Sequence, residues 1–341
     1  MAQNLAVSAL KLVFLGSDPI ALPLLEWLAG EGRAWAEVAA VFTQPDRPAG
    51  RGQLVAPNAI KQWAQSHHLR VFQPEKLTHE VRLQLVDLQA DVALVMAYGH
   101  LLGDDCIATP RLGILNLHTS RLPRYRGASP IQTAVACGES CTAVSLMRIV
   151  RQLDAGPVAD LELVPIAARD TAAVVEAKLA LACVPLLART LPRLAAGTLN
   201  FTEQDHAAAT FCRKLTKEDG HLDFALPAPT LAARINGLYP WPACSVEING
   251  QPVKLGCAEA SGHDAGDPDD PARTPGVVCG TDAVALRIGT GQGLLRVHRL
   301  QRSGGRMLPA AEFLRGFPVA PGTRLASRPM TTLLGLAPFR R

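Results

Sequence analysis

Three polar side chains of this sequence could together carry out an acyl transfer. Asn116 and His118 follow the short apolar run 112–115, which is typical of a buried strand. Residues two apart on a strand share a face and stand ~6 to 7 Å apart, enough for a carbonyl between them. An Asn amide can donate to a developing oxyanion, and a His can exchange a proton near neutral pH. Asp154 could orient that imidazole or stabilise its cationic form.

The residues that follow His118 favour this catalytic interpretation. They include Ser120, Arg121, Leu122, Pro123, Arg126 and Gly127, and Gly156 comes after Asp154. This segment closely resembles the folate-binding signature of the 10-formyltetrahydrofolate-dependent formyltransferases. From spacing alone, Asn and His at a strand end are more often capping and loop residues. The resemblance implies formyl transfer from 10-formyltetrahydrofolate as cosubstrate, with Asn116, His118 and Asp154 as the catalytic residues and no metal.

The same resemblance implies where the folate binds. Ser120, Arg121, Leu122 and Pro123 belong to the signature, and Arg121 stands where the family usually has Leu. This departure concerns the fit around the folate and not the reacting groups. Tyr98 and Gly99 follow another buried strand, 91–96, and we expect them to form a loop against the pterin. A plain turn is the alternative for these two residues.

A second loop bears on the acceptor of the formyl group. Residues 41–52 read VFTQPDRPAGRG and resemble the loop with which members that formylate methionyl-tRNA engage the acceptor arm of initiator tRNA. Arg47 and Arg51 could reach phosphates, and the prolines limit the entropy lost on binding. The alternative is an ordinary surface loop with two solvated arginines.

Three other functions stay open at this point. A formyltransferase acting on an amino sugar nucleotide would keep the same catalytic residues, and the loop 44–52 discriminates against it. A catalytically silent RNA-binding protein is the second, and the intact residues Asn116, His118 and Asp154 argue against it. Hydrolysis of formyltetrahydrofolate is the third. Such hydrolases usually carry a regulatory domain ahead of the catalytic one, whereas here the catalytic domain starts at about residue 10.

The composition is that of a globular protein with a sizeable core. The chain has 341 residues, of which 48% are hydrophobic and 19% charged, with a net charge of +4. Cationic residues gather near the C-terminus. From Thr281 onward the sequence contains ten arginines, and its only acidic residues are Asp282 and Glu312. Such a segment can follow a phosphate backbone, although arginine also outnumbers lysine throughout the chain. The resemblance favours a role in tRNA binding.

Several classes of protein are not supported. The eight cysteines form no paired C-x-x-C pattern of a zinc or redox site. The first turn, 16–19, lacks the G-x-G-x-x-G pattern of dinucleotide-binding folds. Residues 1–10 lack the basic start of a signal peptide, and no apolar run reaches the ~18 residues of a membrane span. We therefore expect a cytoplasmic protein that is not bound to membranes, and we expect a monomer.

The order of apolar segments predicts the fold. Strands are expected at 11–16, 38–42, 71–72, 91–96 and 112–115, and helices at 19–29, 58–67 and 79–89. This alternation predicts a doubly wound, mainly parallel sheet, whose ligands bind beyond the carboxyl ends of the strands. A strand at 158–164 and a helix at 171–194, interrupted or bent by Pro185, are expected to follow.

The remainder predicts a second, β-rich domain. Short strands are expected at 245–248, 252–255, 276–279, 284–288 and 294–300, with a hairpin turn at Asn249-Gly250 and a mobile loop at 261–274. Residues 214–219, 222–224 and 240–242 resemble segments that open the C-terminal domain of the family. The expected layout is a Rossmann-like catalytic domain over 10–196, a linker over 197–214 and an OB-like β-barrel that binds tRNA over 215–335.

Overall fold

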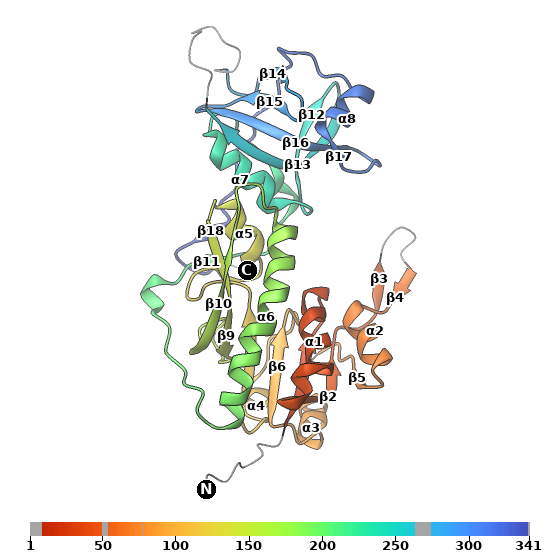
Figure 1. Cartoon of the computed structure of the whole chain (residues 1–341), viewed down its shortest axis with the longest axis vertical. Helices are drawn as coiled ribbons and strands as arrows, with labels where there is room; N and C mark the ends of the chain where they lie inside the picture. Colours follow the sequence, from red (N-terminus) through yellow and green to blue (C-terminus); the bar gives the residue numbers. More distant parts are fainter. Residues whose placement is uncertain (1–8, 50–53, 77, 263–273, 340–341) are drawn as a thin grey trace. The chain divides into compact units, whose positions relative to one another are not determined.

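The computed structural model describes residues 9–49, 54–76, 78–262 and 274–339, which form two compact units (Figure 1). Each unit is assembled from separate stretches of chain. The first comprises Met1–Arg126, Ala143–Val164 and Ala177–Ala209, and the second comprises Gly127–Thr142, Pro165–Glu176 and Thr210–Arg341. The chain thus enters the second unit twice before its C-terminal part completes that unit. Arg51 and most of the predicted loop 261–274 lie outside the described residues.

A mainly parallel sheet organises the first unit. Its order is β10-β9-β7-β6-β1-β2-β5, with strands β1 (Leu10–Gly16), β2 (Ala36–Phe42), β5 (Arg70–Phe72), β6 (Val92–Met96), β7 (Ile114–His118), β9 (Cys141–Arg148) and β10 (Val158–Pro165). The five strands from β5 to β7 run parallel, and β9 is antiparallel to β7. The predicted strands are therefore confirmed, and β9 is an addition that the sequence analysis did not predict.

Helices cover both faces of this sheet. They are η1 (Pro19–Ala21), α1 (Leu22–Ala29), η2 (Glu31–Ala34), α2 (Ala59–Ser66), α3 (His79–Asp87), α4 (Asp104–Ile107) and α6 (Ala172–Ala195). On β6, Val95 lies in one apolar cluster with Val81 of α3. The next residue, Met96, points to the other face, where its sulfur lies 3.9 Å from the Cys183 Sγ of α6. The doubly wound arrangement is confirmed.

The long helix α6 continues through Pro185, so of the two predicted effects of this residue, an interruption or a bend, the interruption is wrong. A proline inside a helix removes one backbone hydrogen bond and costs ~3 kcal/mol. Packing offsets this cost because Cys183, Leu186 and Leu187 around the proline are fully buried. On the next turn, Arg189 donates to Asp160 and to the carbonyl oxygen of Leu161 on β10.

A curled, antiparallel half-barrel forms the second unit. Its strands are β12 (Cys244–Ile248), β13 (Gln251–Ser261), β14 (Val278–Thr281), β15 (Leu286–Gly289), β16 (Leu294–Arg302) and β17 (Leu308–Pro309). The predicted hairpin between β12 and β13 is confirmed, since Asn249 and Gly250 both have the positive φ angles of its turn, 51° and 71°. The small β domain expected from the sequence is thus present. Short strands β8 (Arg126–Gly127), β11 (Phe211–Cys212) and β18 (Leu334–Gly335) also occur.

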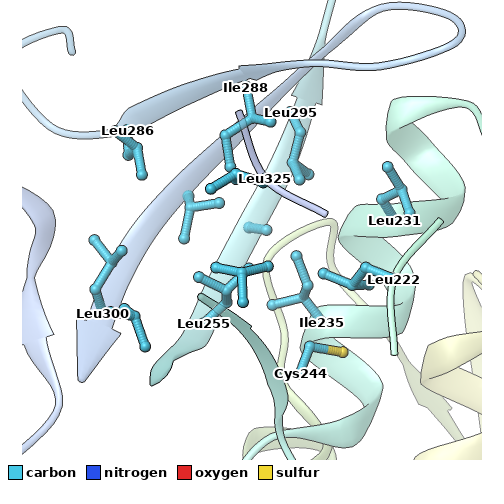
Figure 2. Close-up of a cluster of buried hydrophobic side chains, with 14 of the residues drawn as sticks. Leu222, Leu231, Ile235, Cys244, Leu255, Leu286, Ile288, Leu295, Leu300 and Leu325 are labelled. Atoms are coloured by element: carbon cyan, nitrogen blue, oxygen red, sulfur yellow. The ribbon is translucent and has the colours of Figure 1, made fainter. Parts of the chain in front are cut away.

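Three helices of the second unit were not predicted from the sequence. They are α5 (Pro130–Ala136), α7 (Ala228–Leu238) and α8 (Ala310–Gly316), and a single turn, η4 (Lys217–Gly220), precedes α7. Figure 2 shows Leu231 and Ile235 of α7 pointing into the apolar core that the strands of the half-barrel line. Helix α5 packs on α7 so closely that a Cβ on Gly237 would lie 2.3 Å from the backbone nitrogen of Ala136.

Candidate active site

Asn116 and His118 lie at the carboxyl end of β7, next to the centre of the sheet. Asn116 is paired with Val95 on β6 and with Met147 on β9. His118 is paired with Ser145 on β9 and is 7% exposed, while Asn116 is half-buried. Both residues therefore sit on rigid backbone and share a strand face, as predicted. Among the described residues, the Asn116 side chain has no hydrogen-bond partner, so its amide can donate to a ligand.

Both nitrogens of the His118 imidazole face an oxygen atom. Its Nε2 lies 3.1 Å from the carbonyl oxygen of Tyr125, which can only accept, so Nε2 carries a hydrogen. Its Nδ1 lies 3.7 Å from Oδ1 of Asp154, and the two side chains are 8% and 12% exposed. A protonated imidazole at this position faces an acceptor on each side. The Asp154 carboxylate can stabilise an imidazolium ion, whose positive charge can in turn stabilise an oxyanion that forms nearby.

Hydrogen bonds from two buried hydroxyl groups fix the shape of the loop after β7. Ser120 is fully buried and donates to the carbonyl oxygen of Arg124 at 2.7 Å. Ser145 on β9 donates to the carbonyl oxygen of Ser120 at 2.7 Å and accepts from the backbone N–H of Leu122 at 3.3 Å. The side chain of Arg121, where the signature usually has Leu, is exposed. This departure therefore changes the surface of the loop and not its interior.

Asp154 lies in a strained turn between β9 and β10. Its φ of +51° is in the left-handed region, which costs a residue with a side chain roughly 1 to 2 kcal/mol. Gly156 follows two residues later, and a Cβ there would lie 2.0 Å from the carbonyl oxygen of Arg148. This contact explains why the signature needs glycine at this position. The Nε2 of Gln204 donates to the carbonyl oxygens of Asp154 at 2.9 Å and of Gly156 at 2.6 Å.

Arg126 of the signature binds the other end of Gln204. Its Nε and Nη2 donate to Oε1 of Gln204 at 3.1 and 2.7 Å, and Nη2 also donates to Nδ1 of His206 at 3.1 Å. Burial lowers the pKa of Arg126, and the nearby charge of Asp154 opposes this effect. Sequence reasoning did not identify Gln204, because nothing in its neighbourhood marks it as part of a site 50 residues away.

The loop of Tyr98 and Gly99 presents backbone rather than a ring. The Tyr98 side chain is 2% exposed and belongs to an apolar cluster with Val95 and Cys106. Its carbonyl oxygen accepts from Nε2 of Gln44 at 3.1 Å, and Gly99 has a φ of +82°. A ligand beside this loop would therefore meet main-chain groups of residues 97–99.

The loop that the sequence relates to tRNA binding forms a short hairpin, and polar contacts fix its base. Strands β3 (Arg47–Ala49) and β4 (Leu54–Ala56) pair in antiparallel fashion. At the base, Asp46 forms an ion pair with Lys61 at 2.5 Å and accepts from Gln73 at 2.7 Å. The hydrogen bonds from Lys61 and Gln73 lower the pKa of Asp46. Arg47 is exposed, and it donates to Oε1 of Gln44 at 3.3 Å.

The structure thus gathers groups for acyl transfer at the carboxyl edge of the sheet. His118 and Asp154 are adjacent, and Asn116 is on the same strand as His118. The described ranges contain no group of three or more His, Cys, Asp or Glu side chains that could hold a metal ion. None of the helices in these ranges is long and apolar enough to cross a membrane.

Known protein families match most of the sequence. Residues 10–191 match the formyl transferase family, and residues 214–318 match the formyl transferase C-terminal domain. The chain is 40% identical over 318 residues to the methionyl-tRNA formyltransferase of Chromobacterium violaceum, covering 93% of this chain and 99% of that protein. It is 39% identical over 319 residues to the enzyme of the same name from Thiobacillus denitrificans, covering 93% and 100%.

A solved structure has the same fold at low sequence identity. The crystal structure of WlaRD, a sugar 3N-formyl transferase in the presence of dTDP and 5-N-formyl-THF, aligns with a TM-score of 0.64 and 15% identity. The alignment covers 87% of this chain and 99% of that one. It supports the arrangement of a mainly parallel sheet followed by a small β domain.

Proposed function

The chain belongs to the formyl transferase family, and we infer from this that it is a methionyl-tRNA formyltransferase. It transfers the formyl group of 10-formyltetrahydrofolate to the α-amino group of methionyl initiator tRNA, giving N-formylmethionyl-tRNA for translation initiation. The observation that carries the reaction is the approach of His118 to Asp154 beside Asn116. The acceptor rests on the relatives of that name, which the chain matches over almost their whole length.

In the reaction that we propose, the folate supplies the formyl carbon and the methionyl α-amine attacks it. The amide of Asn116 and the protonated imidazole of His118 stabilise the oxyanion that forms on the formyl oxygen. Asp154 keeps the imidazole cationic, or it passes the amine proton through water to the folate nitrogen, N10. The bond from the formyl carbon to N10 then breaks. The products are the formylated amine and tetrahydrofolate, and none of the proposed steps uses a metal.

We assign the folate site to residues around this edge of the sheet. Ser120, Arg121, Leu122 and Pro123 form the loop that β7 leads into, and Tyr98 and Gly99 form the loop after β6. Ser120 acts through the shape of its loop, because its hydroxyl is engaged by Arg124. Tyr98 and Gly99 act through their backbone, because the tyrosine ring is buried.

We assign tRNA binding to Arg47 on the hairpin, to Arg51, which lies outside the described residues, and to the β domain. Six arginines are exposed among the described residues of that domain: Arg299, Arg302, Arg306, Arg315, Arg324 and Arg328. We place the catalytic domain at 10–196, the linker at 197–214 and the tRNA-binding domain at 215–335. A monomer in the cytoplasm is the state that we propose for the working enzyme.

The assignment is tested by offering the enzyme different acceptors. The protein is incubated with 10-formyltetrahydrofolate and, separately, with methionyl initiator tRNA, methionyl elongator tRNA and an amino sugar nucleotide. We expect formylation of the initiator tRNA in strong preference to the other two. Transfer to the sugar nucleotide alone would refute the assignment of the acceptor.

The assignment of the catalytic residues has its own test. Asn116→Ala, His118→Ala and Asp154→Ala should each abolish most turnover while leaving the fold intact, since one oxyanion donor alone is worth ~10² to 10³ in kcat. His79→Ala, at an exposed histidine on α3, is the matched control and should keep full activity. Near-normal turnover in two of the three variants would show that this site is the wrong one.

A further inference from the structure

The geometry points to Gln204 as a positioning residue for His118. It fixes the two backbone segments that carry the groups facing the two imidazole nitrogens. Gln204 comes from the segment that follows α6, far in sequence from the catalytic residues, and it is 7% exposed. It bonds two separate parts of the site, the Asp154 turn and Arg126. This inference rests on the proposed function, since it concerns the same catalytic residues.

The orientation of the Gln204 amide is fixed by its partners. A guanidinium group can only donate, so the two bonds from Arg126 require the Gln204 oxygen on their side. Carbonyl groups can only accept, so the bonds to Asp154 and Gly156 require the NH₂ group on the other side. Both amide hydrogens and the amide oxygen are therefore used. Among the standard side chains of this size, only glutamine offers this combination, because methionine lacks both functions and glutamate lacks the donors.

On one side, Gln204 stabilises the turn that aims Asp154 at His118. The left-handed backbone of Asp154 is unfavourable without such support, and the two hydrogen bonds fix the carbonyl groups on each side of Ala155. The Asp154 carboxylate extends from this backbone toward Nδ1 of His118. A turn that relaxed would move the carboxylate away from the imidazole.

On the other side, Gln204 anchors the chain that contacts Nε2 of His118. Arg126 is held by Gln204 and is 4% exposed. The preceding residue, Tyr125, has a φ of +61° and accepts from Nε2 through its carbonyl oxygen. Gln204 therefore connects the two backbone segments whose groups face the imidazole nitrogens, the Asp154 carboxylate at Nδ1 and the Tyr125 carbonyl at Nε2. Its loss should reduce the rate of the chemical step more than the binding of either substrate.

The test uses variants that remove parts of this connection. Gln204→Glu keeps the volume and the contact with Arg126 but removes both donors, and Gln204→Met removes donors and acceptor. We expect kcat to fall ~10- to 100-fold in each, with both KM values within ~3-fold of the wild type, as for a catalytic group displaced by ~1 Å. Glu203→Gln, at the exposed neighbouring residue, is the control and should leave kcat unchanged.

A double-mutant cycle with Asp154→Ala separates positioning from a general structural role. If Gln204 acts through Asp154, adding Gln204→Glu to Asp154→Ala should lower kcat by no more than ~3-fold further. Full additivity, an effect on KM alone, or unfolding of both Gln204 variants in thermal melts would overturn the proposal. Failure of the wild type to formylate methionyl initiator tRNA would instead refute the proposed function, so the two outcomes are distinguishable.

Discussion

Replacing Asp219 by Asn should destabilise the second unit by about 2 kcal/mol at pH 7. Asp219 is fully buried at η4, just ahead of α7. Its carboxylate pairs with Arg213 at 2.5 Å, accepts from the backbone N–H of Thr216 at 2.7 Å, and accepts from the hydroxyl of Thr331. An asparagine fits the same space but presents an NH₂ group to some of these donors and leaves Arg213 without its anion.

The magnitude follows from the ionisation of the carboxyl group. Burial raises the pKa of Asp219, but the hydrogen bonds from Arg213, Thr331 and Thr216 outweigh this and lower it from 3.8 to about 2. A tenfold change in an equilibrium corresponds to about 1.4 kcal/mol, so the ionised group adds about 2 kcal/mol to the free energy of unfolding. Because the folded pKa is depressed, this contribution is present above pH ~4 and is lost as the pH falls toward 2.

Hydrogen exchange followed by mass spectrometry measures this effect unit by unit. Peptides from α7 and β16 should exchange about 30-fold faster in the variant at pH 7, whereas peptides from β1 and β6 should be unchanged. The ratio between variant and wild type should shrink when both are compared at the same pH below 4. Glu247→Gln, at an exposed position on β12, is the control and should leave exchange unaltered. Equal exchange of the Asp219→Asn variant and the wild type at pH 7 would refute the reasoning.

Three further variants test the hairpin and the signature. Arg47→Ala should raise the KM for methionyl initiator tRNA ~10-fold without changing kcat and should weaken the salt dependence by one phosphate contact, and an unchanged KM would contradict the proposed contact. Asp46→Asn should raise the same KM ~3-fold, because one partner of Lys61 at the hairpin base becomes neutral, and steady-state kinetics measure this. Gly127→Ala should lower the melting temperature by several degrees, since its φ is +118° and a Cβ would lie 2.0 Å from the carbonyl oxygen of Cys212. Melting at the wild-type temperature would show that the backbone relaxes there.

The sequence predicted the elements whose signal is local. Strands such as β1 and β6 are short apolar runs bounded by turn residues, and a buried strand must be apolar on both faces. The Asn-Gly turn between β12 and β13 belongs to the same class of local signal.

Features that depend on distant contacts were not readable in this way. Helix α5 is so short that its periodicity is weak, and it is stabilised by α7, which follows much later in the chain. Gln204 has no distinctive neighbours, and only the folded backbone brings its amide to Asp154 and Arg126. The continuity of α6 at Pro185 likewise depends on the burial of the residues around this proline. Intrinsic helix propensities carry no information about such packing.

The contact between α5 and α7 sets an order of events during synthesis on the ribosome. Six of the seven residues of α5 are buried in the finished protein, and its partner α7 is made roughly 90 residues later, a delay on the order of ten seconds at ordinary elongation rates. Throughout that interval the residues of α5 that pack on α7 lack this partner. A nascent chain paused between these helices would therefore be a natural client for a chaperone. A protein fragment that ends at residue 196 lacks α7, so the residues of α5 that pack on this helix would stay exposed.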